Sequence, residues 1–244
     1  MVIPGADCRN VAFHPDNQSS SYDVESCPWS NTPDIDFARD DDDEWVIGQF
    51  VWTGFDYLGE PTPYDTNCWP NHSSMFGIID LASIPKDRYY LYRSQWNTAD
   101  TTLHVLPHWN WKGREGEITP VFVYTNYPKA ELFINGRSQG VREKNNSTYY
   151  NRYRLMWMDT RYEPGELKVV AYDASGNPVA EKIVRTAGKP HHIVLTPANT
   201  RQLKADGDDL LYVTVQVADK DGNIVPNDER EVKFLSLIHI SEPT

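Results

Sequence analysis

The 244-residue sequence is poor in cysteine, in basic residues and in long apolar runs. Its 3 cysteines, Cys8, Cys27 and Cys68, are odd in number and match the spacing of neither a zinc site nor a disulfide framework. Lysine and arginine total 23 against 35 acidic residues, giving a net charge of −12. This charge argues against nucleic acids and anionic membranes as partners, because both require a basic surface. No apolar run approaches the ~20 residues that span a bilayer, so the sequence predicts no membrane insertion.

The two ends of the sequence lack recognisable targeting or folding signals. Residues 1–10 contain no basic stretch followed by an apolar segment, so no signal peptide is visible there. Residues 236–244 do not continue the preceding strand pattern and resemble translated sequencing-adapter read-through. We therefore predict a non-native tail at residues 236–244 and assign it no fold.

Aromatic residues, in contrast, are abundant, with 8 Trp, 14 Tyr and 8 Phe. Their flat faces and polar edges suit sugar-binding clefts and β-sandwich cores alike, so composition alone leaves both interpretations open. A hydrophobic content of 39% and a charged content of 24% are typical of a soluble globular protein. The length allows one or two ordinary domains, or three small ones.

Residues 1–102 predict one unit of a β/α fold. The apolar run WVIGQFVW (residues 45–52) has no alternation, which favours a strand buried on both faces, as in a parallel sheet. A helix is predicted over residues 84–96, with Pro85 in its first turn. One face of this helix carries residues at helical spacing, namely Tyr89, Tyr92, Arg93 and Trp96.

From residue 103 the pattern changes to short alternating segments, separated by turn signals such as Asn135–Gly136 and residues 175–178. Strands are predicted over residues 103–107, 118–125, 129–135, 153–157, 166–173 and 178–186. Six or seven strands within about 85 residues are typical of an immunoglobulin-like sandwich. We therefore predict a sandwich domain over residues 103–189.

A second β module, residues 190–235, is predicted after a linker at residues 186–190. Residues 219–223 superficially resemble the start of a calcium loop, but they lack its distal glutamate, so we interpret them as a hairpin turn. A module of about 45 residues is too short to close a sandwich, so we expect it to be truncated. Its strands are predicted over residues 191–197, 210–219 and 230–235.

The loop that follows the predicted buried strand is a candidate sugar-binding site. It combines the ring of Trp52 with the carboxylates of Asp56, Glu60 and Asp65, and parallel-barrel enzymes carry their sites at such strand ends. An indole ring can stack on the apolar face of a sugar, and carboxylates accept hydrogen bonds from its hydroxyls. The equally weighted alternative is that Trp52 belongs to the core and the carboxylates cap turns.

Several of these segments resemble glycoside hydrolase family 2, in particular its β-galactosidases from gut-type Bacteroidota. The stretches GQFVWTGFDYLGEPTPYD (residues 48–65) and SSMFGIIDLASIPKDRYYLYRSQW (residues 73–96) resemble the final strand, loop and helix of that family's catalytic barrel. PHWNW and VYTNYPKAELFINGRSQG (residues 123–140) resemble the sandwich domain that follows the barrel. Residues after 190 resemble the next β-sandwich module, so the resemblance covers nearly the whole chain.

The resemblance implies the C-terminal part of a (β/α)8 barrel, residues 1–102, followed by immunoglobulin-like sandwiches. It also implies hydrolysis of terminal β-galactosides with retention of configuration, by two glutamates about 5–5.5 Å apart. Trp52 matches the tryptophan that shapes the sugar subsite, and Asp56 lies in the same loop, so both are predicted to bind substrate. Neither catalytic glutamate has a counterpart in this sequence. We therefore assign no catalytic residue and expect the chain alone to be inactive.

No cofactor or metal ligand set is evident in the sequence. The acidic run at residues 40–44 could hold a cation, but such runs are more often solvated turns. The family resemblance allows a divalent cation or sodium ion, and an oligomer, in a longer enzyme. It also points to a periplasmic or extracellular location.

Other functions compete with a galactosidase. A non-catalytic carbohydrate-binding protein is supported by the pair of predicted β-sandwiches and by aromatic residues that we expect to be exposed, such as Trp109 and Trp111. Such a protein, however, has no reason to contain the strand at residues 45–52. A purely structural sandwich protein leaves the loop after Trp52 unexplained. A β-glucuronidase or β-mannosidase fragment would share the predicted architecture.

Overall fold

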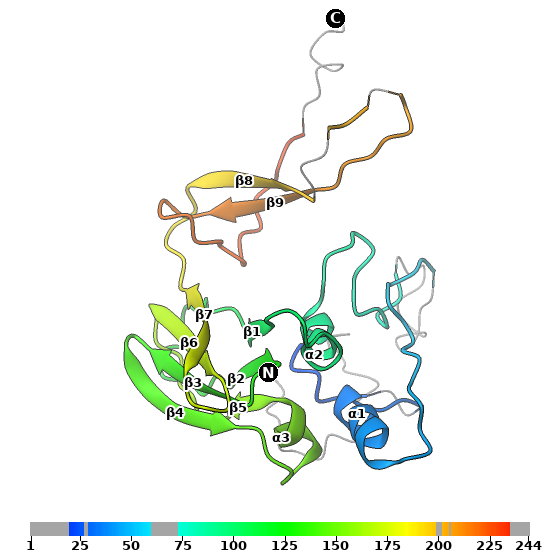
Figure 1. Ribbon diagram of the computed structural model, residues 1–244. Coiled ribbons are helices and arrows are strands. Elements are labelled where there is room, and N and C mark those ends of the chain that lie inside the picture. The colour runs from blue at the N-terminus through cyan, green and yellow to red at the C-terminus, as the bar shows by residue number, and fades with distance from the viewer. Residues whose placement is uncertain (1–19, 27–28, 60–72, 199–201, 205, 235–244) are drawn as a thin grey trace, which may run out of the picture. The chain divides into compact units, whose positions relative to one another are not determined.

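The computed structural model describes residues 20–26, 29–59, 73–198, 202–204 and 206–234 (Figure 1). The chain divides into two units, Met1–Thr186 and Ala187–Thr244. The domain limits predicted at residues 102 and 189 stay predictions. The predicted tail at residues 236–244 lies outside the described residues.

Two antiparallel sheets dominate the first unit, which confirms the prediction of a β-sandwich. One sheet has the strand order β1-β2-β5 and the other has the order β4-β3-β6-β7. The strands of the first sheet are β1 (Leu103–Leu106), β2 (Val121–Thr125) and β5 (Leu155–Trp157). Those of the second are β3 (Lys129–Ile134), β4 (Arg137–Glu143), β6 (Glu166–Tyr172) and β7 (Pro178–Arg185).

The sandwich core follows from alternation along β3 and β6. Every second residue of these two strands is buried, as the period of a strand with one face inward requires. These side chains pack with Val121, Val123, Trp109 and Trp157 between the two sheets. Burial of each valine, leucine or isoleucine side chain in this core contributes about 1.5–3 kcal/mol to the stability of the fold. The inward residues of β3 and β6 are Ala130, Leu132, Ile134, Leu167, Val169 and Ala171.

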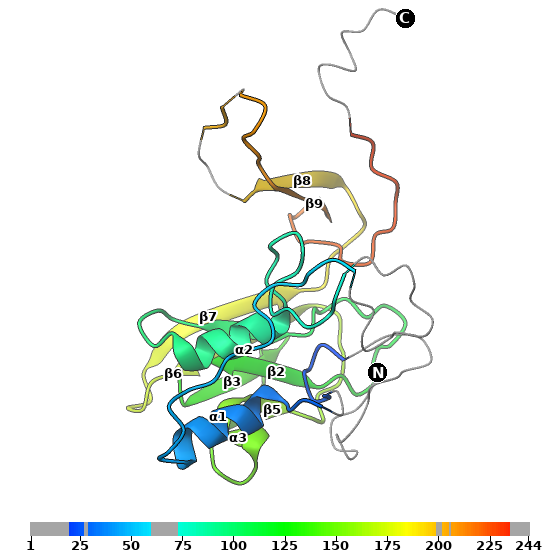
Figure 2. The same ribbon diagram turned by 90° about the vertical axis from the view of Figure 1, so that its right-hand side faces the viewer.

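Strand β2 is buried along its whole length because both of its faces are covered. Its second face, with Phe122 and Tyr124, packs into another core together with residues of two helices, α1 (Pro33–Asp42) and α2 (Asp87–Trp96). Figure 2 shows both helices lying over the sandwich, with the short helix α3 (Tyr149–Tyr153) beside α1. The helices and the sandwich therefore share one strand as a common wall.

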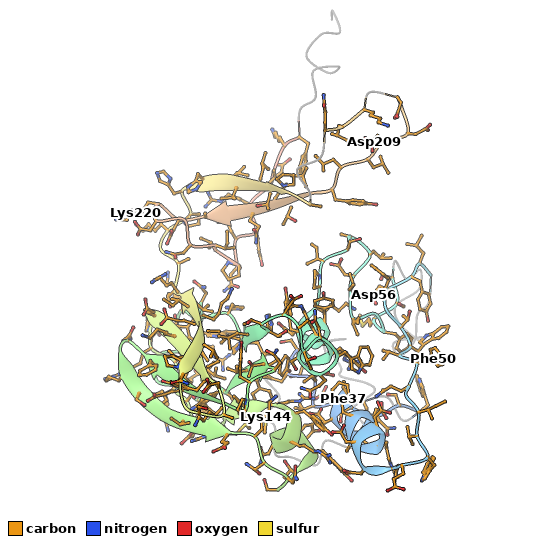
Figure 3. The ribbon with its side chains drawn as sticks, viewed as in Figure 1. Phe37, Phe50, Asp56, Lys144, Asp209 and Lys220 are labelled. Carbon is orange, nitrogen blue, oxygen red and sulfur yellow. The ribbon has the colours of Figure 1, made fainter. Side chains whose placement is uncertain are left out.

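The segment predicted as a buried strand, residues 45–52, forms no strand, and this prediction is wrong for the chain. Ile47 and Phe50 are fully exposed, and Trp45 is 77% exposed. An apolar run can be buried on both faces only when strands flank it and other layers cover it. No strand pairs with this run among the described residues. Figure 3 contrasts Phe50, at the rim, with Phe37, which lies inside the packed helices.

The helix predicted over residues 84–96 is confirmed as α2, although Pro85 precedes it and Lys86 occupies the N-cap position. On the predicted face, Tyr92 is buried, whereas the terminal Trp96 is half exposed. The turn at Asn135–Gly136 is also confirmed, because both residues adopt positive φ angles of 48° and 77°. No helix in the described part of the chain is long and apolar enough to cross a membrane.

The second unit contains one described antiparallel pair, β8 (His192–Pro197) and β9 (Val213–Ala218). Residues 219–223 form the predicted turn, and the Asp219 carboxylate accepts hydrogen bonds from the amides of Asp221 and Asn223, both at 2.9 Å. Those backbone contacts explain the calcium-like spacing as turn chemistry. Residues 230–234 of the predicted third strand show no strand pairing.

Candidate functional site

The loop after Trp52 is built from two segments that hydrogen-bond to each other. Residues 53–57 face residues 74–79, and backbone bonds join Ile78 N to Thr53 O (3.1 Å) and Asp56 N to Ile79 O (2.9 Å). Gly77 lies at the closest approach, because an added Cβ would sit 2.2 Å from the Asp56 nitrogen. Only glycine therefore fits there without moving the backbone.

Asp56 is the anchor of this loop. Its carboxylate accepts hydrogen bonds from Gly77 N at 2.7 Å and Ser74 Oγ at 3.4 Å, and it forms an ion pair with Lys86 Nζ at 2.6 Å. The side chain is almost completely buried. Both carboxylate oxygens are thus occupied by the protein, so Asp56 can fix the loop in place more readily than it can reach a ligand.

Trp52, in contrast, presents its ring to solvent and is 75% exposed. Its Nε1 donates a hydrogen bond to the Tyr57 hydroxyl at 3.2 Å, and the two rings meet edge to face with centroids 6.1 Å apart. The peptide bond between Trp52 and Thr53 is cis. An exposed indole face held along one edge is suited to stacking on a sugar ring. The alternative that Trp52 belongs to the core does not describe this chain.

The structure brings Trp52 and Asp56 into one loop but gives them different surroundings. The other predicted carboxylates of this loop, Glu60 and Asp65, lie outside the described residues. Sequence reasoning missed Lys86 and Tyr57 as the partners that hold the loop. Both residues lie in the segments that resemble the family, but nothing in the sequence paired Tyr57 with Trp52 or Lys86 with Asp56.

The acidic run at residues 40–44 docks α1 onto α3. Arg152 donates to Asp42 at 2.8 Å and to Asp41 at 3.2 Å, and the Tyr153 hydroxyl donates to Asp41 at 2.7 Å. The hydrogen bond from Arg152 lowers the pKa of Asp42. The charge of Arg152 offsets these carboxylates at the C-terminal end of α1, where the helix dipole disfavours them. No metal-binding cluster of His, Cys, Asp or Glu occurs among the described residues.

A fully buried ion pair, Asp34 with Arg154, joins α1 to the sandwich. Arg154 Nε donates to Asp34 at 2.7 Å, and the other guanidinium nitrogens donate to the carbonyl oxygens of Tyr22 (2.7 Å) and Asp23 (2.9 Å). Burial raises the pKa of Asp34, and the charge of Arg154 opposes this effect. The sequence signal for this pair was an arginine within an otherwise apolar predicted strand.

The tryptophans that could have supported a sugar-binding sandwich are not free. Trp109 is completely buried, and its Nε1 donates to Glu163 O at 2.8 Å. Trp111 is half-buried, with His108 stacked 4.3 Å from its ring and the Arg114 guanidinium 5.4 Å from the ring centroid. The expectation of exposed platforms is therefore wrong for Trp109, and the Trp111 ring is already occupied by neighbours.

Two family models match this chain. Residues 116–180 match a domain of unknown function (DUF4982), and residues 193–235 match the glycoside hydrolase family 2 C-terminal domain 5. The first match covers most of the sandwich, and the second covers the described pair of strands in the second unit.

Known proteins similar to this chain include several glycosidases. The chain is 47% identical to Beta-galactosidase BoGH2A of Bacteroides ovatus over 88% of its own length and 24% of that protein. It is 35% identical to a putative beta-glucuronidase of Formosa agariphila, over 94% of the chain and 22% of that protein.

Solved structures give the same result. A beta-glycosidase from Bacteroides vulgatus aligns with a TM-score of 0.73 and 35% identity, over 85% of this chain and 25% of that one. A glycosyl hydrolase family 2 member from Bacteroides cellulosilyticus aligns with a TM-score of 0.64 and 31% identity, over 74% of this chain and 26% of that one. The chain spans about a quarter of the length of these relatives. It belongs to glycoside hydrolase family 2 and corresponds to that family's C-terminal region.

Proposed function

We propose that this chain is the C-terminal part of a retaining glycosidase that hydrolyses terminal β-galactosides. In this proposal residues 1–102 end a (β/α)8 barrel, and residues 103–189 and 190–235 belong to two β-sandwich domains. The observation that carries the proposal is the exposed indole of Trp52, held by Tyr57 in a loop that Asp56 anchors. The similarity to a β-galactosidase along 88% of the chain supports it.

The exposed apolar run before Trp52 supports the barrel. Trp45, Ile47 and Phe50 leave large apolar surfaces uncovered, and burying each would contribute about 1.5–3 kcal/mol. Proteins seldom leave several large apolar side chains of one short segment open to water unless another surface covers them. The remaining part of a longer enzyme would supply that surface, and Trp52 would then lie at a barrel end, where such enzymes carry their sites.

Within the proposed enzyme, Trp52 stacks on the apolar face of the sugar and Asp56 positions the loop that carries it. Retaining hydrolysis also requires a nucleophile and an acid/base, supplied by two carboxyl groups about 5–5.5 Å apart. This chain matches neither of the family's glutamate motifs. We therefore expect the purified 244-residue chain to give no turnover of a nitrophenyl β-galactoside above the buffer rate. Turnover that co-purifies with the chain would overturn this expectation.

The DNA upstream of the first codon provides the direct test of the proposed enzyme. We expect the reading frame to continue into a segment that contains both glutamates, the acid/base in an Asn-Glu pair, as the family resemblance implies, and the nucleophile further along. The longer protein should hydrolyse the β-galactoside, and replacing either glutamate with glutamine should abolish turnover. An active longer protein that needs neither glutamate would refute the retaining mechanism, and an inactive one would refute hydrolysis of β-galactosides.

A β-glucuronidase is the second candidate, because the relative with 35% identity carries that name. A glucuronide carries a carboxylate and is best recognised by a cation. Near the described part of the loop the cation is Lys86, and Asp56 already neutralises it. This arrangement favours a neutral sugar over a glucuronide. Comparing kcat/KM of the longer protein on nitrophenyl galactoside and nitrophenyl glucuronide decides between the two.

A further inference from the structure

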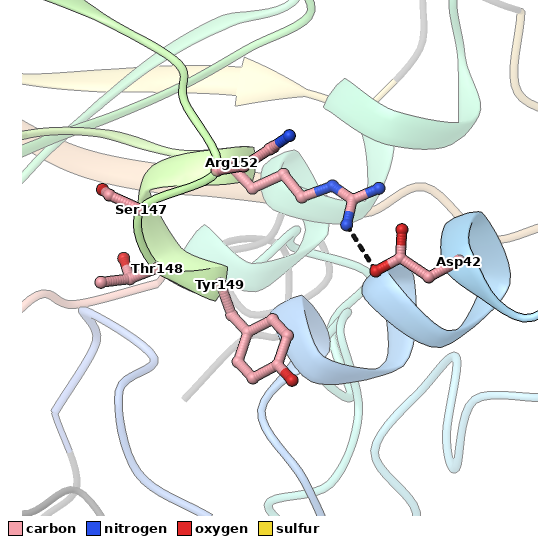
Figure 4. A pocket seen from close by; sticks show the side chains of 6 residues that line it. Asp42, Ser147, Thr148, Tyr149 and Arg152 are labelled. Carbon is pink, nitrogen blue, oxygen red and sulfur yellow. Dashed lines mark hydrogen bonds and ion pairs between the residues drawn. The ribbon is translucent and has the colours of Figure 1, made fainter.

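A hollow that contains no residue of the Trp52 loop lies where α1 meets α3. It has a volume of about 510 Å³, within the ~300–1,000 Å³ typical of small-molecule pockets. Figure 4 shows Arg152 extending to Asp42, with the Tyr149 ring on the same side of α3. The lining residues are Asp42, Asn146, Ser147, Thr148, Tyr149 and Arg152.

The two walls of this hollow are fixed to each other. Arg152 of α3 binds Asp41 and Asp42 of α1, and the rings of Phe37 and Tyr153 meet edge to face with centroids 5.3 Å apart. The hollow therefore exists before any ligand binds, and little ordering is needed on binding.

Three groups at the hollow remain available for a ligand. The Tyr149 side chain is 55% exposed and its hydroxyl has no hydrogen-bond partner in the described part of the chain. Asp42 uses one carboxylate oxygen for Arg152, which leaves the other unbonded within the same residues. The Asn146 carboxamide likewise makes no hydrogen bond to a described residue. In contrast, Ser147 and Thr148 use their hydroxyl oxygens to accept bonds from Asn151.

The charges around the hollow select the class of ligand. Arg152 is shared by two carboxylates, so a phosphate, sulfate or uronate would meet net negative charge and, among the described residues that line the hollow, no free cation. The described residues contain no cluster able to hold a metal ion. A phenol ring beside an acceptor oxygen and a carboxamide suits a neutral ligand that has both an apolar face and hydroxyl groups.

We propose that this hollow is an accessory binding site for a neutral saccharide of one or two rings. The Tyr149 ring packs against the apolar face of the sugar, and Asp42 and Asn146 bond its hydroxyls. The site rests on the proposed function for the class of ligand, but it requires neither the barrel nor the catalytic glutamates. It can therefore be tested on the 244-residue chain itself.

The test is a titration of the isotopically labelled full chain with lactose, followed by two-dimensional amide NMR. We expect concentration-dependent shifts at residues 146–149 and at Arg152. Tyr149→Ala and Asp42→Asn should each weaken lactose binding about tenfold, the change expected on losing one contact to a charged or stacked group. Tyr149→Phe should retain most of the affinity, because it keeps the ring.

Matched controls separate this site from general effects. Tyr212→Ala removes a tyrosine of nearly equal exposure, 56% against 55%, in the other unit, and it should leave binding unchanged. Glucuronic acid should cause no shift at the hollow, because it is anionic. Since Tyr149 is exposed, its replacement should leave the dispersion of the spectrum intact.

The results of the lactose titration test the accessory site separately from the proposed glycosidase function. Lactose shifts confined to the surroundings of Trp52, and lost in Trp52→Ala, would overturn the accessory site and leave the proposed glycosidase standing. Unchanged affinity in Tyr149→Ala, equal binding of glucuronic acid, or no lactose binding would each overturn the accessory site. The glycosidase proposal is judged separately, by turnover of the longer protein.

Discussion

Two regions of the molecule each hold a buried aspartate paired with a cation, but in different surroundings. One is the seam, where α1 meets the sandwich, and the other is the loop after Trp52. Asp34 and Arg154 are both fully buried, close to the packed rings of α1 and the sandwich. Asp56 is nearly as buried, yet the side chain of its partner Lys86 remains 33% exposed and the neighbouring Trp52 is open to solvent. A similar contact therefore joins two layers in one place and preorganises an open loop in the other.

Removing the buried cation should have the largest effect on stability. Arg154→Ala leaves the Asp34 carboxylate buried without a charge partner, and breaking such a pair typically costs about 3–5 kcal/mol. Urea unfolding followed by tryptophan fluorescence measures this loss. The control is Arg185→Ala, which breaks an exposed pair with Glu166 and should cost less than about 1 kcal/mol. Equal losses of unfolding free energy in the two variants would show that burial does not decide how much an ion pair contributes to stability.

Lys144 extends the comparison to a partly buried cation without a carboxylate partner in the described residues. Its Nζ donates to Thr125 O at 2.6 Å, and burial lowers the pKa of Lys144 to about 8. The unfolded chain, whose lysine has a pKa of 10.5, binds more protons between pH 8 and 10.5. Stability should therefore rise with pH across this window.

Lys144→Met should abolish this pH dependence. We expect the difference in unfolding free energy between the wild-type chain and the variant to change by up to about 2 kcal/mol between pH 8 and pH 10. Parallel urea titrations at pH 8, 9 and 10 measure it, and effects of other groups, such as the buried tyrosines, cancel in the difference. A difference that is constant with pH would contradict the lowered pKa.

Lys86→Ala should have a smaller and more local effect than Arg154→Ala. Asp56 would keep its bonds from Gly77 and Ser74, and the exposure of Lys86 weakens the lost ion pair, so we expect a cost of about 1 kcal/mol. Hydrogen exchange at the Gly77 amide should accelerate more than exchange in β2. Acceleration of similar size throughout the unit would indicate that the loop and the seam unfold together.

Trp52→Ala should have the smallest effect on stability and the most selective effect on function. Because the ring is exposed, we expect a change within about 0.5 kcal/mol, whereas Trp109→Ala in the core should cost about 3–5 kcal/mol. In the longer enzyme, Trp52→Ala should lower kcat/KM for a β-galactoside about tenfold through loss of stacking. A large loss of stability in Trp52→Ala would instead assign the ring a packing role.

Most of the sandwich was predictable because its strands alternate, and alternation depends only on which face is buried. Strands β3 and β6 show this pattern directly. Strand β4 was missed because its sequence, RSQGVRE, is polar and largely exposed. Its place is set by the Asn135–Gly136 turn and by pairing with β3, which the composition of the strand itself does not reveal.

The surroundings of the site were less predictable than its residues. The family resemblance pointed to Trp52 and Asp56 as candidates, but residue type does not show that one is open and the other enclosed. The apolar run at residues 45–52 wrongly predicted burial, because burial also depends on which other segments cover a run, and composition does not show that. Arg154 was overlooked because its partner Asp34 lies far away in the sequence, and only the folded chain brings them together.

The shared strand β2 also limits how this protein can be divided or recombined. A cut at residue 102 would strip α1 and α2 from one face of the strand and leave Phe122 and Tyr124 facing water. The sandwich therefore cannot be transferred to another protein by itself without exposing this apolar face. Gene fusions, truncated expression fragments and domain exchanges between related enzymes should retain both helices with it.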